Sequence, residues 1–341
     1  MRATSMMKAL QTEGFKAQVL FLYKKRPAYD NISGVSVLLD RPPINVADFV
    51  TILVRLYHHI KQFKPTAVVG MAHYSSPIAT LVAMLLGVPR RVATQTNPPK
   101  THNILARILD WICGTTGVYT ANIAASVAIY SDFVKYPSTY RKRLKVVTNG
   151  ITIRNPTLTR AEAREKFGLS PKRYLLVNCG RLSEQKNQKY LFQVIENLPD
   201  VDLVIIGEGE KRAALEKEIL DRGLSSRVTL LGEVAPDIVP NVLICGDVFL
   251  FPSTYEAFGL AAVEAMRSGL PVIASNHPAL VEVIGNAGIL LPLTHPKKWA
   301  DEVMHIRQDN AFLEEIKMLG FQRSEEFSFE AMLAGFKKHI F

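Results

Sequence analysis

The feature that most constrains the fold is an alternation of short apolar runs with amphipathic stretches along the second half of the chain. The runs are rich in β-branched residues, and stretches with helical spacing, such as residues 209–222, separate them. The runs are Tyr174–Cys179, Leu203–Ile206, Val228–Leu231, Val248–Phe251, Val272–Ala274 and Ile289–Leu291. Strands that alternate with helices form parallel, doubly wound sheets. The sequence therefore predicts an α/β fold with a Rossmann-like unit in this half.

The first half repeats the pattern. Its strand candidates are Ala17–Tyr23, Ala67–Met71, Val92–Thr94, Ala124–Ile129 and Lys145–Val147, and residues 46–63 form a long helix candidate. A chain of 341 residues is long enough for two such domains. The turn dipeptide at 149–150 sets the boundary, which gives domains 1–152 and 153–326. The last segment, 327–341, has helical spacing and needs a surface, for which the first domain is one candidate.

The composition of the chain limits the cellular compartments in which we expect it. No apolar run reaches the length that spans a bilayer, and the first ten residues lack the apolar core of a secretory signal. Cys113, Cys179 and Cys245 are widely spaced, which favours reduced thiols over a disulfide framework or a zinc site. We therefore expect a cytoplasmic protein.

Charge is unevenly distributed. Residues 1–150 contain 19 Lys and Arg against 6 Asp and Glu, a balance of +13 in a chain whose total is +10. Clusters stand at 24–26, 90–91 and 141–143. Such an excess suits nucleic acid, anionic lipid or an anionic substrate. No recognition helix, zinc spacing or basic strand with interleaved aromatic residues accompanies it, so nucleic acid is the weakest of the three.

The segment 247–275 carries the clearest chemistry. An apolar strand ends at Pro252, a loop carries Glu256, and a helix begins near Gly259 and contains Glu264. Ligands bind at the carboxyl ends of strands in open α/β sheets, and free amides at a helix N-terminus suit a phosphate. Two carboxylates flanking these amides can accept hydrogen bonds from two sugars of one elongated ligand. Read alone, the same glutamates could be ordinary surface charges.

Two further loops follow strands. Arg181 and Lys186 flank a strand-to-helix turn, where two cations would neutralise a departing diphosphate. Glu208 follows the next strand in a Gly-Glu-Gly loop. Solvated surface charge is the alternative interpretation of all three residues.

The stretch 252–271 resembles the signature of glycosyltransferase family 4, in which two glutamates lie within a Glu-x-Phe-Gly-Leu…Glu-Ala-Met…Gly-x-Pro context. The resemblance implies that Glu256 contacts the donor sugar and Glu264 the ribose. The backbone of residues Phe258, Gly259 and Leu260 would then face the diphosphate. The Arg181 to Lys186 segment and the loop of Glu208 also match the family, the latter near the base.

The resemblance implies a GT-B fold, in which two Rossmann-like doubly wound domains face a cleft. It also implies a retaining transferase that takes a nucleotide diphosphate sugar, by expectation a UDP-sugar, as its donor. The acceptor would be lipid-linked or a polysaccharide, in cell-envelope or exopolysaccharide synthesis at the inner face of a bacterial-type membrane. No cofactor or metal is expected, because Asp200 and Asp202 have a metal-binding spacing but stand before their strand.

Two departures from the family stand in the first half. The family opens with a strand and a Gly-Gly loop, whereas this sequence opens on the helix candidate 4–13, so we expect the first domain to lack its first strand. The family also places a histidine after the strand that here precedes Gln95. His73, after the strand before that one, is the best remaining candidate for an acceptor-site residue, although a histidine at a strand end is more often structural.

Other functions stay open. A relative that binds nucleotide-sugar or membrane without turnover would keep the same motifs. A dehydrogenase is disfavoured, because no Gly-x-Gly-x-x-Gly follows a first strand.

Overall fold

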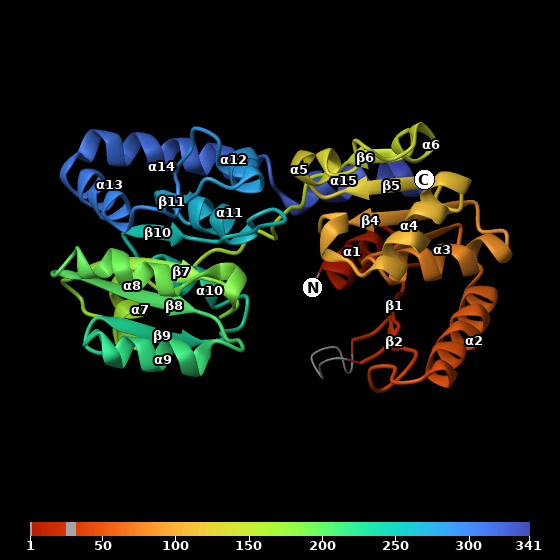
Figure 1. Cartoon of the computed structure of the whole chain (residues 1–341), viewed down its shortest axis with the longest axis horizontal. Helices are drawn as coiled ribbons and strands as arrows, with labels where there is room; N and C mark the ends of the chain where they lie inside the picture. Colours follow the sequence, from red (N-terminus) through yellow and green to blue (C-terminus); the bar gives the residue numbers. More distant parts are fainter. Residues whose placement is uncertain (1, 25–31) are drawn as a thin grey trace. The chain divides into compact units, whose positions relative to one another are not determined.

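The computed structural model describes residues 2–24 and 32–341, and the chain divides into two compact units (Figure 1). The N-terminal unit contains residues 1–147 together with 333–341, and the C-terminal unit contains residues 148–332. Two members of the basic cluster at 24–26, Lys25 and Arg26, lie outside the described residues.

Six parallel strands form the sheet of the C-terminal unit, in the order β12-β11-β10-β7-β8-β9. Their bounds are β7 (Tyr174–Cys179), β8 (Val201–Ile206), β9 (Val228–Gly232), β10 (Val248–Phe251), β11 (Val272–Ser275) and β12 (Ile289–Leu291). All six predicted strands are present. The chain adds strands in one direction from β7 to β9 and in the other from β10 to β12, so the topological switch point lies between β7 and β10.

Side chains of this sheet alternate between two buried cores. Leu176, Ile205 and Leu250 belong to one core, while Val177, Val204 and Phe249 belong to the other. The first core is covered by α8 (Lys189–Glu196), α9 (Arg212–Asp221) and α13 (Pro296–Gln308). The second is covered by α7 (Arg160–Lys166), α10 (Val239–Leu243), α11 (Leu260–Arg267), α12 (Pro278–Ile284) and α14 (Asn310–Glu325). The predicted doubly wound α/β fold is therefore confirmed for this unit.

The N-terminal unit contains two parallel sheets, β1-β2 and β3-β4-β5-β6. Their strands are β1 (Val19–Phe21), β2 (Val35–Val37), β3 (Ala67–Gly70), β4 (Arg90–Gln95), β5 (Ala121–Ala124) and β6 (Leu144–Val146). The helices are α1 (Arg2–Thr12), α2 (Val46–Phe63), α3 (Ser75–Leu85), α4 (Ile104–Thr116), α5 (Val127–Ser131) and α6 (Ser138–Arg141).

The prediction of a strand over 124–129 was wrong. The strand β5 ends at Ala124, and residues 127–131 form the helix α5. Ser126 causes the change, because its side chain accepts a hydrogen bond from the amide of Ile129 at 3.1 Å and so caps the helix.

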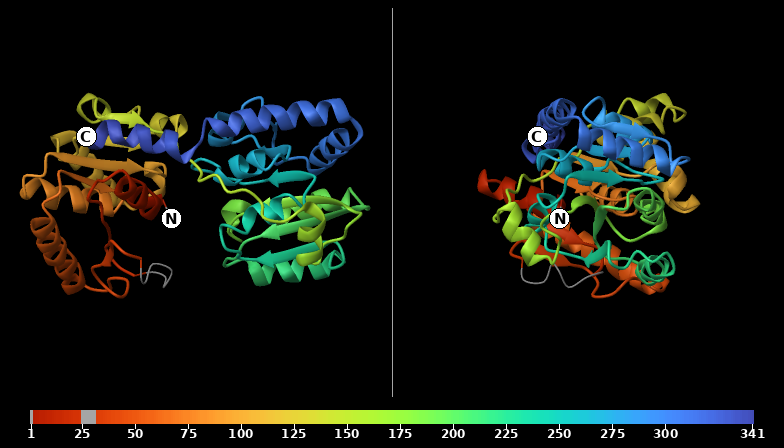
Figure 2. Two further views of the ribbon diagram at one scale, coloured as in Figure 1. Left: turned by 180° about the vertical axis from the view of Figure 1, so that it is seen from behind. Right: turned by 90° about the vertical axis from the view of Figure 1, so that its left-hand side faces the viewer.

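The last helix, α15 (Phe329–Ile340), returns to the N-terminal unit, where it lies beside β5 and β6 (Figures 1 and 2). The ring of Phe341 stacks on that of Phe15 with centroids 4.4 Å apart, and Lys337 forms an ion pair with Glu13. The two ends of the described chain thus pack on each other.

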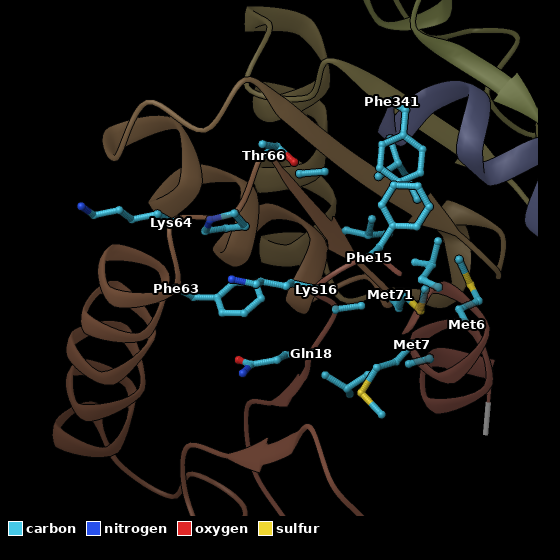
Figure 3. A pocket seen from close by; sticks show the side chains of 18 residues that line it. Met6, Met7, Phe15, Lys16, Gln18, Phe63, Lys64, Thr66, Met71 and Phe341 are labelled. Carbon is cyan, nitrogen blue, oxygen red and sulfur yellow. The ribbon is translucent and has the colours of Figure 1, made fainter. Parts of the chain in front are cut away.

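A groove separates the two sheets of the N-terminal unit. Among residues 2–24 and 32–341, β1 pairs only with β2 and β3 only with β4, so the two strand edges that face the groove have no strand between them. Two cavities of about 360 and 430 Å³ lie along it. Figure 3 shows the first, which Met6, Met7 and Met71 line. The helix α1 runs along this groove, since Ala3 lines both cavities and Leu10 lines the first.

Candidate functional site

Three loops meet at the carboxyl ends of neighbouring strands in the C-terminal unit. They follow β7, β8 and β10, the strands on either side of the switch point. The loops after β7 and β10 are tied together, because Thr254 N donates to Gln185 O at 2.9 Å and Gln185 Nε2 donates to Tyr255 O at 2.9 Å. Asn187 adopts a left-handed conformation with φ of 51° and donates through Nδ2 to Pro252 O at 3.3 Å. The backbone at the switch point is therefore fixed by direct hydrogen bonds.

Lys186 and Glu256 form an ion pair across the switch point. Their side chains are only 18% and 8% exposed. The ammonium group of Lys186 also lies 4.7 Å from the centroid of the Phe251 ring, and Ser253 Oγ donates to Glu256 Oε1 at 2.9 Å. Glu256 Oε1 accepts both hydrogen bonds, and no residue in the described ranges donates to Oε2. One oxygen of a nearly buried carboxylate is therefore left for another donor.

The helix α11 begins beside this pair. Gly259 stands at its N-cap with φ of 99°, and a Cβ on this residue would meet Leu280 Cδ2 at 2.5 Å. No side chain caps the helix there. Phe258 is buried and packs edge-on against Phe327, so only its backbone is available to a ligand, whereas Leu260 is partly exposed. The first turn of α11 therefore presents main-chain amides, which suit an anion.

Glu264 lies on α11, one turn beyond its start, in a small depression lined by Thr152, Arg154 and Pro236. Burial raises the pKa of its carboxyl group, and the charge of Arg154 partly opposes this. In the described part of the chain, no residue donates a hydrogen bond to this carboxylate. Burial, together with the charge of Glu264, raises the pKa of the Cys179 thiol to about 12. A partly buried carboxylate without a protein donor can accept hydrogen bonds from a ligand in this depression.

Arg181 and Glu208 lie on the loops after β7 and β8. Arg181 is exposed and its guanidinium group bonds Glu210 at 2.9 Å, while Glu208 pairs with Arg212. The two loops are in contact, because Leu182 N donates to Glu208 O at 3.0 Å and a Cβ on Gly207 would come within 2.1 Å of Gly180 O. Arg181 and Lys186 thus each pair with a different carboxylate, an arrangement that the sequence did not predict.

His73 belongs to the N-terminal unit, just after β3. Its ring stacks on that of His102, with centroids 4.2 Å apart and planes 17° apart. Burial lowers the pKa of His73. Burial, His73 and Arg107 lower the pKa of His102 to about 4. This pair could not be predicted from the sequence, since the two histidines are 29 positions apart and follow different strands.

Gln95, expected to follow its strand, is the last residue of β4, and its role is structural. It is buried and donates through Nε2 to Asp110 Oδ1 at 2.7 Å. Tyr119 and Tyr140 donate to the same carboxylate at 3.0 and 2.7 Å. Burial raises the pKa of Asp110, and these three hydrogen bonds oppose the rise.

Asp200 and Asp202 form separate ion pairs. Asp200 bonds Arg307 at 2.6 Å, and Asp202 bonds Arg173 at 2.6 Å from within β8 and not, as expected, from before its strand. Over residues 2–24 and 32–341, no three His, Cys, Asp or Glu side chains come together as metal ligands would. The helices of the same ranges include none with the length and apolar character to cross a bilayer.

Sequence reasoning missed two contributors to the site. Ser253 orients Glu256 from three positions upstream, and a hydroxyl residue directly after a buried strand is the signal that could have indicated it. Arg154 stands in the polar stretch just after the predicted domain boundary, yet its charge acts on Glu264. The position of Arg154 in the sequence gave no signal, because its approach to α11 depends on the tertiary fold.

Comparison with known proteins agrees with this geometry. Residues 159–321 match the family model of glycosyl transferases group 1, and this segment contains Arg181, Lys186, Glu208, Glu256 and Glu264. Among curated relatives, the alpha-D-kanosaminyltransferase of Streptomyces kanamyceticus is 32% identical over 156 residues, which are 44% of this chain and 40% of the relative.

A second relative is the UDP-Gal:alpha-D-GlcNAc-diphosphoundecaprenol alpha-1,3-galactosyltransferase of Escherichia coli. It is 29% identical over 243 residues, which are 66% of this chain and 61% of the relative. The chain therefore spans less than two thirds of the length of either relative.

The solved structure of HepE from Anabaena in complex with UDP and glucose has the same fold. It superimposes with a TM-score of 0.84 at 18% identity and covers 99% of this chain and 94% of its own. This likeness extends the agreement from the matched segment to both units. The chain has the GT-B fold, and its residues 159–321 are similar to the glycosyl transferases group 1 family.

Proposed function

We propose that the chain transfers a sugar from a nucleotide diphosphate sugar to a glycan or lipid-linked acceptor, with retention of configuration. The observation that carries the proposal is the pair of carboxylates around the start of α11. Glu256 has an oxygen without a donor, and Glu264 is partly buried and accepts no hydrogen bond from any described residue. Ligand hydroxyls would satisfy both, and the uncapped amides between them suit a diphosphate.

Each site residue then has a role. Glu256 accepts a hydrogen bond from the donor sugar, and Glu264 accepts from the ribose. Lys186 and Arg181 stabilise the diphosphate as negative charge develops on it, which is the step that most needs such stabilisation. To reach the diphosphate, Arg181 breaks its exposed ion pair with Glu210 and binds a phosphate oxygen instead. Glu208 is assigned to the region near the base. His73 is assigned, in the N-terminal unit, to the acceptor.

Transfer would proceed on one face of the sugar. The bond between the anomeric carbon and the diphosphate oxygen breaks, and the acceptor oxygen forms its bond from the same side. The acceptor proton moves to the departing phosphate oxygen. This route needs neither a nucleophile from the protein nor a metal ion. The UDP form of the donor is favoured because UDP is the nucleotide bound by HepE and UDP-galactose the donor named for the E. coli relative.

The acceptor is proposed to be a lipid-linked or polysaccharide chain of the cell envelope, and the location the cytoplasm, with peripheral attachment to the inner face of the plasma membrane. The E. coli relative acts on a diphosphoundecaprenol-linked sugar, which supports the lipid-linked class. The positive charge of the first 150 residues also suits an anionic acceptor or surface.

The test measures release of UDP from UDP-glucose, UDP-galactose and UDP-N-acetylglucosamine, and binding of UDP by calorimetry. We expect binding of UDP and turnover of at least one donor, and a large loss of turnover for Glu256→Gln. Glu314→Gln is the matched control, since Glu314 is exposed on α14 and pairs there with Lys317. If Glu256→Gln leaves turnover unchanged, the proposed role of Glu256 is wrong.

One observation favours a second candidate, a relative that binds donor without transfer. The open groove beside β1 and β3 lies where the family resemblance implies a strand and its Gly-Gly loop. UDP binding with no turnover of any donor would favour this second candidate.

A further inference from the structure

The helix α2 carries two apolar stripes, of which only one is buried. Ile52, Leu56 and Ile60 pack into the core. A second stripe, with residues three and four positions apart, is exposed to solvent. Its members are Val46, Phe49, Val50, Leu53, Val54 and Tyr57. Surface helices ordinarily turn polar residues outward, so the second stripe needs an explanation beyond folding.

The helix α4 repeats this arrangement. Its buried side contains Ala106, Asp110 and Cys113. Its exposed side carries apolar residues at positions 104, 105, 108, 111 and 112, which again form one stripe. The helix α3 packs against both α2 and α4 and adds the exposed Met84 and Leu85 at its end. We call the exposed apolar residues of α2, α3 and α4 together the α2–α4 face.

The charges around the α2–α4 face have one sign. Residues 41–116 contain eight Lys and Arg, two Asp and no Glu. Both acidic side chains, Asp48 and Asp110, are buried, and both already have hydrogen-bond or ion-pair partners within the protein. Asp48 bonds Arg41 at 2.8 Å, and Asp110 accepts from Gln95 and two tyrosines. Arg55, Lys61 and Arg107 are exposed on the same helices. The α2–α4 face therefore combines apolar side chains with cations and has no exposed carboxylate within this segment.

We propose that the α2–α4 face docks on a lipid bilayer that contains anionic headgroups. Apolar side chains on helices that lie along a membrane enter the boundary between headgroups and acyl chains, while Lys and Arg stay at headgroup level. Each cation near an anionic surface adds to the attraction. A second copy of the same face would bring like charges together, which disfavours a symmetric dimer. The proposal rests on the proposed function and assigns its membrane attachment to one face, because a lipid-linked acceptor is reached at a bilayer.

The chain supplies its own probe for this contact. It contains two tryptophans: Trp111 is 44% exposed on α4, and Trp299 is fully buried in the C-terminal unit. The emission of Trp111 should move to shorter wavelength when it leaves water, while that of Trp299 stays constant. The variant Trp111→Phe removes the signal but leaves an apolar ring in place.

The experiment mixes the full chain with vesicles of phosphatidylcholine alone, or of phosphatidylcholine with phosphatidylglycerol, and measures emission and co-sedimentation. We expect binding to the mixed vesicles, little to phosphatidylcholine, and weakening by salt. The double variant Phe49→Asp with Ile108→Asp should weaken binding at least about tenfold, because two apolar side chains no longer enter the bilayer. Leu220→Asp on α9 is the matched control, since Leu220 is 70% exposed in the C-terminal unit.

Each result decides the proposal. No binding to the mixed vesicles, or equal binding by the double variant, overturns it. A dimer in solution that the double variant converts to monomer also overturns it, since a second copy then covers the α2–α4 face. If the aspartate substitutions disturb folding, the double variant Phe49→Ser with Ile108→Ser replaces them in the same two measurements. UDP release is measured separately, in solution without vesicles. A failure of the proposed transfer can therefore be distinguished from a failure to bind vesicles.

Discussion

The ion pair of Lys186 and Glu256 provides a quantitative test of the site. Replacing Lys186 by Met leaves a carboxylate that is 8% exposed with Ser253 as its remaining donor, so we expect a loss of about 3 kcal/mol. Replacing Glu256 by Gln costs less, about 2 kcal/mol, because Lys186 is 18% exposed and keeps its contact with the Phe251 ring. The double variant carries no unpaired charge and should lose only about 2 kcal/mol.

These values predict a coupling energy of about 3 kcal/mol between the two side chains. The assay is urea unfolding, followed by the emission of Trp299 in a Trp111→Phe background. Trp299 reports on the C-terminal unit, because its side chain is buried there and Nε1 donates to Pro292 O at 3.1 Å. Single losses that add in the double variant to within about 0.5 kcal/mol would refute the reasoning, since independent sites behave in that way.

Three further predictions concern single positions. Glu264→Gln should raise the urea midpoint of the C-terminal unit at neutral pH and weaken UDP binding in calorimetry. Burial raises the pKa of the native carboxyl, so its destabilisation is present above that pKa and disappears below the unfolded value; a midpoint difference that persists at low pH contradicts this. Gly259→Ala should cost more than about 2 kcal/mol by the same assay, because φ is 99° and the new Cβ would meet Leu280. His102, with a pKa of about 4 in the native state, contributes stability above its unfolded pKa that is lost as pH falls toward 4. Thermal unfolding across this range should show a smaller loss for His102→Asn than for the wild type, and equal losses would exclude His102 as the cause.

The fold of the C-terminal unit was predictable because its central strands β7, β8, β10 and β11 are buried on both faces and read as apolar runs. The bounds of β7, β10 and β12 coincide with the apolar runs in the sequence. In contrast, β2 was not predicted. It is as short as β12, but its middle residue is the exposed Ser36, so no continuous apolar run marks it in the sequence. The misassigned strand at 124–129 shows how a capping serine inside an apolar run can convert its second half into a helix.

The site was predictable in its residues but not in its pairings. Glu256 and Lys186 were recognised in separate motifs, 70 positions apart, and the sequence assigned them to different parts of a ligand. Their ion pair depends on β10 lying next to β7, which is a property of strand order and not of either motif. The stacking of His73 on His102 depends in the same way on β3 lying next to β4.

The groove between β1 and β3 also affects how the N-terminal unit should open. Within the described residues, no backbone ladder joins the β1-β2 sheet to the β3-β6 sheet, and side chains of α1 and α2 supply the connection. Opening along the groove breaks side-chain packing but no strand pairing, so it is less costly than separating paired strands. Residues of α1, β1 and β2 thus form a local unfolding unit, whose amides should exchange with solvent before those of β4 and β5.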